Sequence, residues 1–166
     1  MSDGSDLRPG VRPGVRVGVD VGKVRIGVAR CDPHAVLATP VATLKRGDGD
    51  IAELGRLAGE LGAMEFVVGL PLSLSGEDTA STGDAREFAQ RLAAATEISV
   101  RLVDERLSTV SAQRVLHTSG RNSRQSRPVV DQVAATIILQ HAIDGERALG
   151  VPSGTVVAAD GTRDAS

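Results

Sequence analysis

The 166-residue chain has few aromatic residues: Phe66 and Phe88 are present, but tyrosine and tryptophan are absent. Its hydrophobic core must therefore be built mainly from aliphatic side chains. This composition argues against functions in which bases stack on aromatic rings, as they do on RRM sheets and in single-strand-binding OB folds. The length predicts a single domain, which buries enough surface to fold without disulfides or a structural metal.

Cysteine and long apolar runs are also scarce. The single cysteine, Cys31, cannot form an internal disulfide, so we expect a reduced thiol, with an intermolecular disulfide as the alternative. The longest apolar run has four residues, as in 35–38. Such a run is too short for a membrane span or for a signal-peptide core near the N-terminus. We therefore expect a cytoplasmic protein without a membrane partner.

The net charge is small and its distribution is uneven. A formal charge of −2 and a pI of about 5.9 argue by themselves against nucleic-acid binding. However, the segment 106–130 contains no acidic residue and carries a charge of +5, which leaves −7 for the rest of the chain. All five cations of this basic segment are arginines, which bind phosphate in bidentate fashion. They are Arg106, Arg114, Arg121, Arg124 and Arg127.

The first half of the chain has the alternating pattern of β-strands. Residues 1–14 are rich in Gly, Pro, Asp and Arg, and we expect a flexible tail there. Valines alternate with other residues over 15–21, and the pattern resumes at 24–28. The intervening Gly22-Lys23 suits a two-residue type II′ turn, which predicts an antiparallel hairpin. A third strand, near 37–44, contains Pro40, which favours an edge position.

The second half predicts helices alternating with strands. We expect a helix from a capping pair at Asp50 and Glu53, a buried strand over 66–70 and a loop over 71–83. A helix around 85–92 and a strand over 98–103 follow, then helices over 110–116 and 129–148, the second of which Pro128 helps to start.

The fold class that these elements predict is a three-layer α/β domain over 15–149, with a second flexible tail over 150–166. Its sheet would be mixed and five-stranded, with three antiparallel strands followed by αβαβαα. Right-handed crossovers place helices on both faces of such a sheet.

Asp20 occupies a costly position in the first strand, because an ionised carboxylate in a central strand must be paired or bound to a cation. With a two-residue turn, Asp20 would face Arg25, so a cross-strand ion pair is one interpretation. Gly22, two residues further on, leaves a spot without a side chain where a phosphate could approach the backbone.

Two more carboxylates stand at the ends of predicted elements. Glu105 follows the last strand, at the edge where α/β sheets usually bind ligands, although a solvated cluster with Asp104 and Arg106 is the alternative. Asp131 shares a helical stripe with alanines and Ile138 that should face the sheet. A carboxylate in a first turn also gains from the helix dipole, which is the simpler interpretation of Asp131.

Together, Asp20, Glu105 and Asp131 point to a metal site. If they converge, each pair about 4 Å apart would repel by about 4 kcal/mol at an effective dielectric constant near 20, so a cation or a proton is needed. Oxygen ligands without Cys or His favour Mg²⁺ or Mn²⁺. Two such ions held by carboxylates serve in-line displacement at phosphodiesters. The neighbouring basic segment could then bind the backbone of a nucleic acid.

Four segments resemble the YqgF (RuvX) family, whose members are described as pre-16S rRNA nucleases or Holliday-junction-resolvase-like proteins. They are GVDVGKVRIGVA at 18–29, VGLPL at 68–72, DERLST at 104–109 and VDQVAA at 130–135. The order and spacing of the motifs match over about 15–145, which makes the resemblance specific.

The resemblance implies an RNase H-like fold and a nuclease that uses divalent metal ions. It places the acidic catalytic and metal-binding positions on Asp20, Glu105 and Asp131. It also implies that Gly22, Lys23, Arg25 and Arg106 border the site. From the basic segment, we expect Arg121, Arg124 and Arg127 to position phosphates. The implied cofactor is Mg²⁺ or Mn²⁺, with two ions. The favoured substrate is the 5′ end of pre-16S rRNA in ribosome biogenesis.

Three other functions remain open on the sequence. The nearest is cleavage of four-way DNA junctions, which requires two sites and hence favours a homodimer over a monomer; an intermolecular Cys31 disulfide could link its subunits. A second is ATP binding, because Asp20-x-Gly22 also resembles the phosphate motif of actin-like and sugar-kinase-like domains, although those sites need a second lobe. A third is a binding protein for nucleic acid or for ribosome assembly that lacks catalysis.

Overall fold

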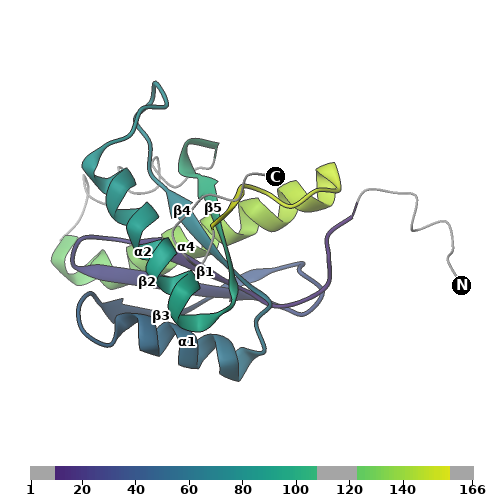
Figure 1. The fold of residues 1–166 in the computed structure, drawn as a ribbon, viewed down its shortest axis with the longest axis horizontal. Coiled ribbons are helices and arrows are strands. Elements are labelled where there is room, and N and C mark those ends of the chain that lie inside the picture. Colours follow the sequence, from purple (N-terminus) through teal and green to yellow (C-terminus); the bar gives the residue numbers. More distant parts are fainter. Residues whose placement is uncertain (1–9, 108–122, 158–166) are drawn as a thin grey trace, which may run out of the picture.

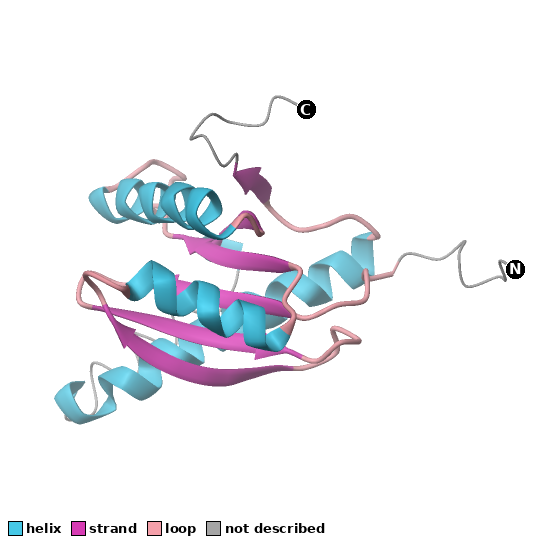
Figure 2. Cartoon of the chain, turned by 60° about the horizontal axis from the view of Figure 1, so that its bottom comes forward, coloured by secondary structure: helices cyan, strands magenta, loops and turns pink. Residues whose placement is uncertain are grey.

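A computed structural model describes residues 10–107 and 123–157, which form a three-layer α/β domain (Figures 1 and 2). The strands are β1 (Arg16–Val21), β2 (Arg25–Cys31), β3 (Ala38–Lys45), β4 (Glu65–Leu70), β5 (Ser99–Asp104) and β6 (Thr155–Val157). The helices are α1 (Asp50–Leu61), α2 (Ala80–Thr96), the 3-10 turn η2 (Glu105–Leu107) and α4 (Ser123–Leu149). The predicted mixed α/β class is therefore confirmed.

The sheet has the order β3-β2-β1-β4-β5-β6. β1, β2 and β3 pair antiparallel, β4 and β5 extend the sheet in parallel to β1, and β6 is antiparallel to β5. Helices α1 and α2 cover one face and α4 covers the other (Figure 1). Pro40 lies on the edge strand β3, as predicted from its missing N–H group.

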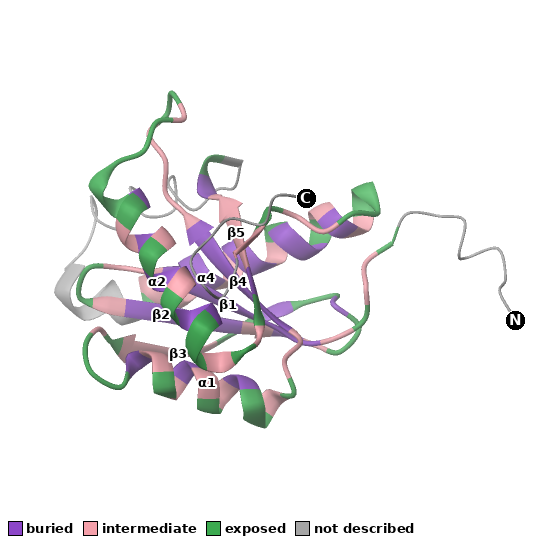
Figure 3. Cartoon of the chain, in the orientation of Figure 1, coloured by how far each residue is buried: buried purple, intermediate pink, exposed green. Residues whose placement is uncertain are grey.

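The alternation in β1 separates two apolar cores. Val17 and Val19 are fully buried against the layer of α1 and α2, whereas Gly18 faces α4. A Cβ at Gly18 would lie 2.8 Å from the Leu139 Cβ and 2.9 Å from the Ala135 carbonyl oxygen. Glycine is therefore what lets α4 pack directly on the central strand, which is buried along most of its length (Figure 3).

The β1–β2 turn differs from the predicted two-residue loop. Val21 pairs with Ile26 and Asp20 with Gly27, so Asp20 does not face Arg25 in the register of the hairpin. The turn is shifted by one residue: the Gly22 N–H donates to the Arg25 carbonyl oxygen at 2.9 Å, so the two residues at the tip are Lys23 and Val24 rather than Gly22 and Lys23. A Cβ at Gly22 would lie 2.7 Å from that same oxygen, so this turn also requires glycine.

The predicted capping pair of α1 and the predicted start of α2 are wrong. α1 has Gly49 as its N-cap, without a side-chain cap, and Asp50 instead accepts hydrogen bonds from the N–H groups of Gly47 and Ile51. α2 begins at Ala80, inside the predicted loop, because Thr79 and Thr82 form a reciprocal capping box.

The second flexible tail and the last helix also need correction. Residues 155–157 form β6 on the edge of the sheet, so this part of the predicted tail belongs to the domain, and the sheet has six strands rather than five. α4 begins at Ser123, upstream of Pro128. The prediction missed this start because residues 123–127 are polar and show no apolar period. The predicted helix over 110–116, residues 1–9 and residues 158–166 lie outside the described residues.

Cys31 is fully buried on the α4 face of β2. The Arg16 N–H donates to its sulfur at 3.3 Å, and burial raises the pKa of the thiol. An intermolecular disulfide needs an accessible sulfur, so the structure does not support Cys31 as a link between subunits. Within residues 10–107 and 123–157, we find no helix of the length and apolarity required to cross a membrane.

Candidate functional site

Asp20 lies near the carboxyl end of β1, on the face covered by α4. Its side chain is almost completely enclosed, with 2% of the residue exposed. In the register of the hairpin it stands directly opposite Gly27 of β2. On its other side is Gly69 of β4, because Val19 pairs with Val68 and the next residues along the two parallel strands are Asp20 and Gly69. The buried carboxylate is therefore flanked by two residues without side chains.

Glu105 lies over one of these glycines. It follows β5 directly, as the first residue of η2, and is 5% exposed. A Cβ at Gly69 would lie 2.6 Å from the Glu105 Oε2 and 3.0 Å from its Cγ. The missing side chain of Gly69 thus makes room for the Glu105 carboxyl group on the strand that neighbours Asp20.

Asp131 lies over the other glycine. A Cβ at Gly27 would lie 1.9 Å from the Asp131 carbonyl oxygen and 3.1 Å from its Cβ, so α4 touches the sheet at this point. Together, Gly27 and Gly69 allow Asp131 and Glu105 to approach the sheet on the two sides of Asp20. The structure thus brings the three acidic residues singled out in the sequence to one face and one end of the sheet.

Asp131 has an ionic partner. The Arg25 Nε lies 2.8 Å from the Asp131 Oδ2, and the two side chains are 28% and 17% exposed. Among the described residues, no group of three or more His, Cys, Asp or Glu side chains is arranged so that it could hold a metal ion. In donor chemistry the three carboxylates fit a hard divalent cation, but Asp131 is engaged with Arg25.

Arg106 is held beside Glu105 by its own acidic neighbour. Its Nη2 lies 2.7 Å from the Asp104 Oδ2, and hydrogen bonding to Arg106 lowers the pKa of the Asp104 carboxyl. Its Nη1 donates to the Leu74 carbonyl oxygen at 3.4 Å and would lie 3.0 Å from a Cβ at Gly76. Arg106 therefore connects the end of β5 to the loop that follows β4.

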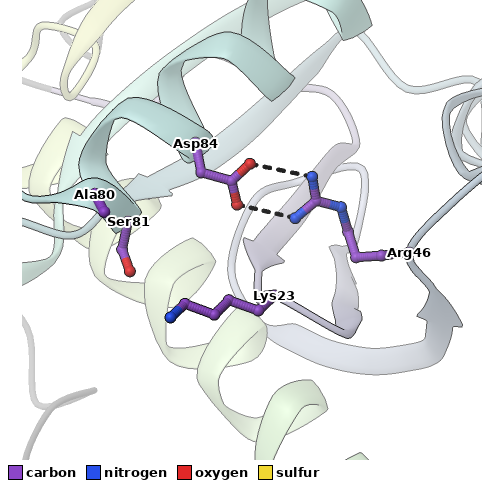
Figure 4. A pocket seen from close by; sticks show the side chains of 5 residues that line it. All are labelled: Lys23, Arg46, Ala80, Ser81 and Asp84. Carbon is purple, nitrogen blue, oxygen red and sulfur yellow. Dashed lines mark hydrogen bonds and ion pairs between the residues drawn. The ribbon is translucent and has the colours of Figure 1, made fainter.

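A pocket of about 290 Å³ opens on the α2 side of the β1–β2 turn (Figure 4). It is lined by Lys23, Arg46, Ala80, Ser81 and Asp84. Arg46 donates to both oxygens of Asp84, at 2.9 and 3.1 Å, and this interaction lowers the pKa of the Asp84 carboxyl. It also donates to the Gly22 carbonyl oxygen at 2.7 Å, so the pocket anchors the turn that carries Lys23.

The sequence interpretation missed the importance of four of these residues. Gly27 and Gly69 occur in the motifs, but their effect depends on which helix or side chain crosses above them. Arg46 and Asp84 are 38 residues apart, and no local pattern pairs them. Of the predicted phosphate-binding arginines, Arg121 lies outside the described residues, and the side chains of Arg124 and Arg127 in α4 are not described.

Comparisons with known proteins agree with this arrangement. A family model described as RuvX, Holliday junction resolvase, matches residues 14–145. A Clavibacter sepedonicus protein named "Putative pre-16S rRNA nuclease" is 61% identical over 139 residues, which cover 82% of this chain and 86% of that protein. A Kineococcus radiotolerans protein of the same name is 48% identical over 163 residues, which cover 96% of this chain and 85% of that protein.

Among solved structures, the chain is similar to Thermus thermophilus RuvC in complex with a Holliday junction substrate. The TM-score is 0.54 and the sequence identity 14%, over 85% of this chain and 99% of that one. This similarity extends to the fold, and it confirms the predicted RNase H-like architecture.

Proposed function

The chain belongs to the RuvX family, as the match over residues 14–145 shows, and from this premise we propose that it is an endonuclease that hydrolyses phosphodiester bonds of structured nucleic acid. We take pre-16S rRNA as its substrate, and its 5′ end as the site of cleavage, because relatives as much as 61% identical are named "Putative pre-16S rRNA nuclease" and the sequence motifs favour the 5′ end. The observation that carries the proposal is the placement of buried Asp20 and Glu105 around Gly69, at the end of the sheet.

Asp20 and Glu105 would hold the metal ions, and Asp131 would complete the ligand set. Oxygen donors of this type suit Mg²⁺ or Mn²⁺. When bound, two such ions supply a nucleophilic hydroxide and stabilise the leaving oxygen of the phosphodiester. The protein contributes a carboxylate fixed in a central strand and a second one fixed over Gly69, which limits the movement of both groups before substrate arrives.

Cationic residues around the carboxylates would bind the substrate backbone. Lys23 and Arg25 lie in and next to the β1–β2 turn, and Arg106 follows Glu105. The Gly22 backbone forms the same turn. Arg121, Arg124 and Arg127 remain predicted phosphate-binding residues from the basic segment of the sequence. Contacts of this kind set affinity and position, while the shape of the nucleic acid supplies selectivity.

A parallel cleavage assay tests the proposal. A pre-16S rRNA 5′ fragment and a synthetic four-way DNA junction are each incubated with wild type or Asp20→Asn in Mg²⁺, Mn²⁺ or EDTA. We expect wild type to cleave the rRNA fragment in either metal, and EDTA or Asp20→Asn to abolish cleavage. Gel-shift binding in EDTA should persist in the variant. Cleavage by Asp20→Asn at the wild-type rate would show that Asp20 is not a catalytic residue.

Cleavage of four-way DNA junctions is the second candidate, since the family description names this activity and the fold matches that of a junction-bound RuvC. Symmetric cleavage of a junction requires two sites and hence a dimer. In the same assay, paired incisions in the junction and an intact rRNA fragment would favour this candidate. If wild type cleaves neither substrate, a binding role in ribosome assembly without catalysis would be favoured.

A further inference from the structure

The ion pair between Arg25 and Asp131 joins two elements of the site that are 106 residues apart in sequence. Arg25 is the first residue of β2, and Asp131 lies where α4 crosses Gly27. At 2.8 Å the contact is a charge-assisted hydrogen bond through the Arg25 Nε. The two terminal amino groups of Arg25 donate no hydrogen bond to any residue that the structure describes. They are the donors with which a guanidinium also grips phosphate.

The backbone of Asp131 is already in place for a role in the site. Its carbonyl oxygen is packed against Gly27, and Gly27 is the residue opposite Asp20 in the hairpin. Directly opposed residues of antiparallel strands have Cα atoms roughly 4.5–5.5 Å apart. The backbone of Asp131 therefore lies next to the strand residue that pairs with Asp20, and the proposal below requires only the Asp131 side chain to move.

In the described residues, Asp131 is paired with Arg25, and no group of three or more His, Cys, Asp or Glu side chains is arranged to hold a metal ion. While Arg25 is paired with Asp131, its guanidinium competes with a metal ion for that carboxylate. A nucleic-acid phosphate at the entrance of the site would offer Arg25 an anionic partner of its own, since 28% of the arginine side chain is exposed to solvent.

On this geometry, we infer that Arg25 is a latch for the metal ligand Asp131. Without substrate, Arg25 holds Asp131 out of the ligand set; a substrate phosphate then takes Arg25, and Asp131 joins Asp20 and Glu105. The inference rests on the proposed function, because it assumes that Asp131 is a metal ligand. Arg25 is on this view a positioning residue that couples metal binding to substrate binding, and linkage makes the coupling reciprocal.

The test measures the affinity of the purified full chain for Mn²⁺ alone, by titration calorimetry without nucleic acid. Arg25→Gln removes the charge of the latch, and we expect Mn²⁺ to bind about two- to fivefold more tightly than to wild type, the scale of one ion pair of this exposure. Arg25→Lys keeps the charge and should stay near wild type. Arg30→Gln removes a charge from the same strand away from Asp131 and serves as the matched control. Thermal melts establish that each variant is folded.

Asp131→Asn, alone and combined with Arg25→Gln, separates the latch from the assignment of the site. The latch predicts that Asp131→Asn alone has little effect on Mn²⁺ binding, because Arg25 already holds that carboxylate away from the metal when no nucleic acid is bound. It also predicts that Arg25→Gln no longer tightens Mn²⁺ binding once Asp131 is replaced in the double variant. If Asp131→Asn weakens binding but Arg25→Gln matches Arg30→Gln, the latch is wrong and the site assignment stands. If Asp131→Asn has no effect even in the Arg25→Gln background, Asp131 is not a ligand, and both ideas fall.

Discussion

The two ends of the sheet both bury charge, but they do so differently. At the amino ends of the parallel strands, Glu65 and Glu146 are 3% and 4% exposed, and each is bound by more than one arginine. Glu65 pairs with Arg12 at 3.1 Å and Arg101 at 2.8 Å. Glu146 pairs with Arg12 at 2.7 Å and with the fully buried Arg16 at 3.2 Å. Here three arginines surround two glutamates.

At the opposite end, acids outnumber arginines among the described residues. Asp20, Glu105 and Asp131 gather around Gly27 and Gly69. Of the arginines described there, Arg25 is paired with Asp131 and Arg106 with Asp104. A compensated network stabilises the fold, whereas an acidic one favours an added cation. The comparison therefore separates charge that serves stability from charge that is positioned for chemistry. Substitutions at each end should have opposite consequences.

The largest effect is expected at the acidic end. Asp20→Asn removes a charge at the centre of the proposed metal site, so cleavage should fall by about a thousandfold or more, because metal ions supply several kcal/mol of transition-state stabilisation. Rates on the rRNA fragment measure this loss, and thermal melts establish that the variant is folded. Asp144→Asn, an exposed acid on α4, is the control and should change neither.

At the compensated end, Glu65→Gln should show the reverse. Neutralising this buried carboxylate leaves Arg101 without its ionic partner and Arg12 with Glu146 alone, and breaking a buried pair in this way costs about 3 kcal/mol of the free energy of unfolding. Urea titration measures this cost. Glu60→Gln disrupts an exposed pair with Arg56 on α1 and should cost well under 1 kcal/mol. A loss of cleavage in Glu65→Gln at full folding would blur the distinction between the two ends.

A smaller effect is expected at Gly69, where room is made for Glu105. In Gly69→Ala the new Cβ would lie 2.6 Å from the Glu105 Oε2 and from the Ile138 Cδ1. Both atoms end flexible side chains, so we expect a modest loss of stability, about 1 kcal/mol, but a displaced carboxylate and a loss of cleavage of about tenfold. Gly59→Ala, in α1 with open space around it, is the control. An unchanged cleavage rate would show that the position of Glu105 is unimportant.

Much of the fold was predictable because its signals are local. Alternating valines predicted β1, Pro40 predicted an edge, and the apolar stripe beyond Asp131 predicted the helix that packs on the sheet. Features set by tertiary contacts were not predictable. β6 has three residues, too few for a period, and the start of α2 depends on threonines that also occur in loops. The pairing of Asp20 with Gly27 depends on the hydrogen bond from Gly22 to Arg25 in the turn, which no sequence pattern shows. The predicted partner of Arg25 was therefore Asp20, whereas the structure pairs Arg25 with Asp131.

The candidate site divides in the same way. The three carboxylates could be singled out because each stands where an unpaired charge would be costly in its own element. Their arrangement could not, because it depends on Gly27 and Gly69, and a glycine in a strand has the same local pattern whether or not a helix crosses it. Likewise, the ion pairs of Glu65 and Glu146 could not be predicted, because they join residues as far apart in sequence as Arg12 and Glu146, 134 residues, and no local motif indicates such a pair.

The smallest effect concerns acid stability, which should depend on the compensated end. Burial by itself raises the pKa of Glu146, but hydrogen bonds from the Arg12 side chain and N–H group outweigh it, and the pKa lies below its ordinary value of 4.5. Because the folded pKa is lowered, the carboxylate stabilises the fold above about pH 4.5, and this contribution is lost as the pH falls through the lowered pKa.

Melting curves between pH 6 and pH 3 should therefore show a smaller acid-induced decrease in melting temperature for Glu146→Gln than for wild type, although the variant starts from a lower melting temperature. Asp144→Asn, on the same helix, controls for the loss of one acid. Equal decreases in wild type and Glu146→Gln would mean that the acid sensitivity of the protein arises elsewhere, and the division between the two ends would then not extend to pH.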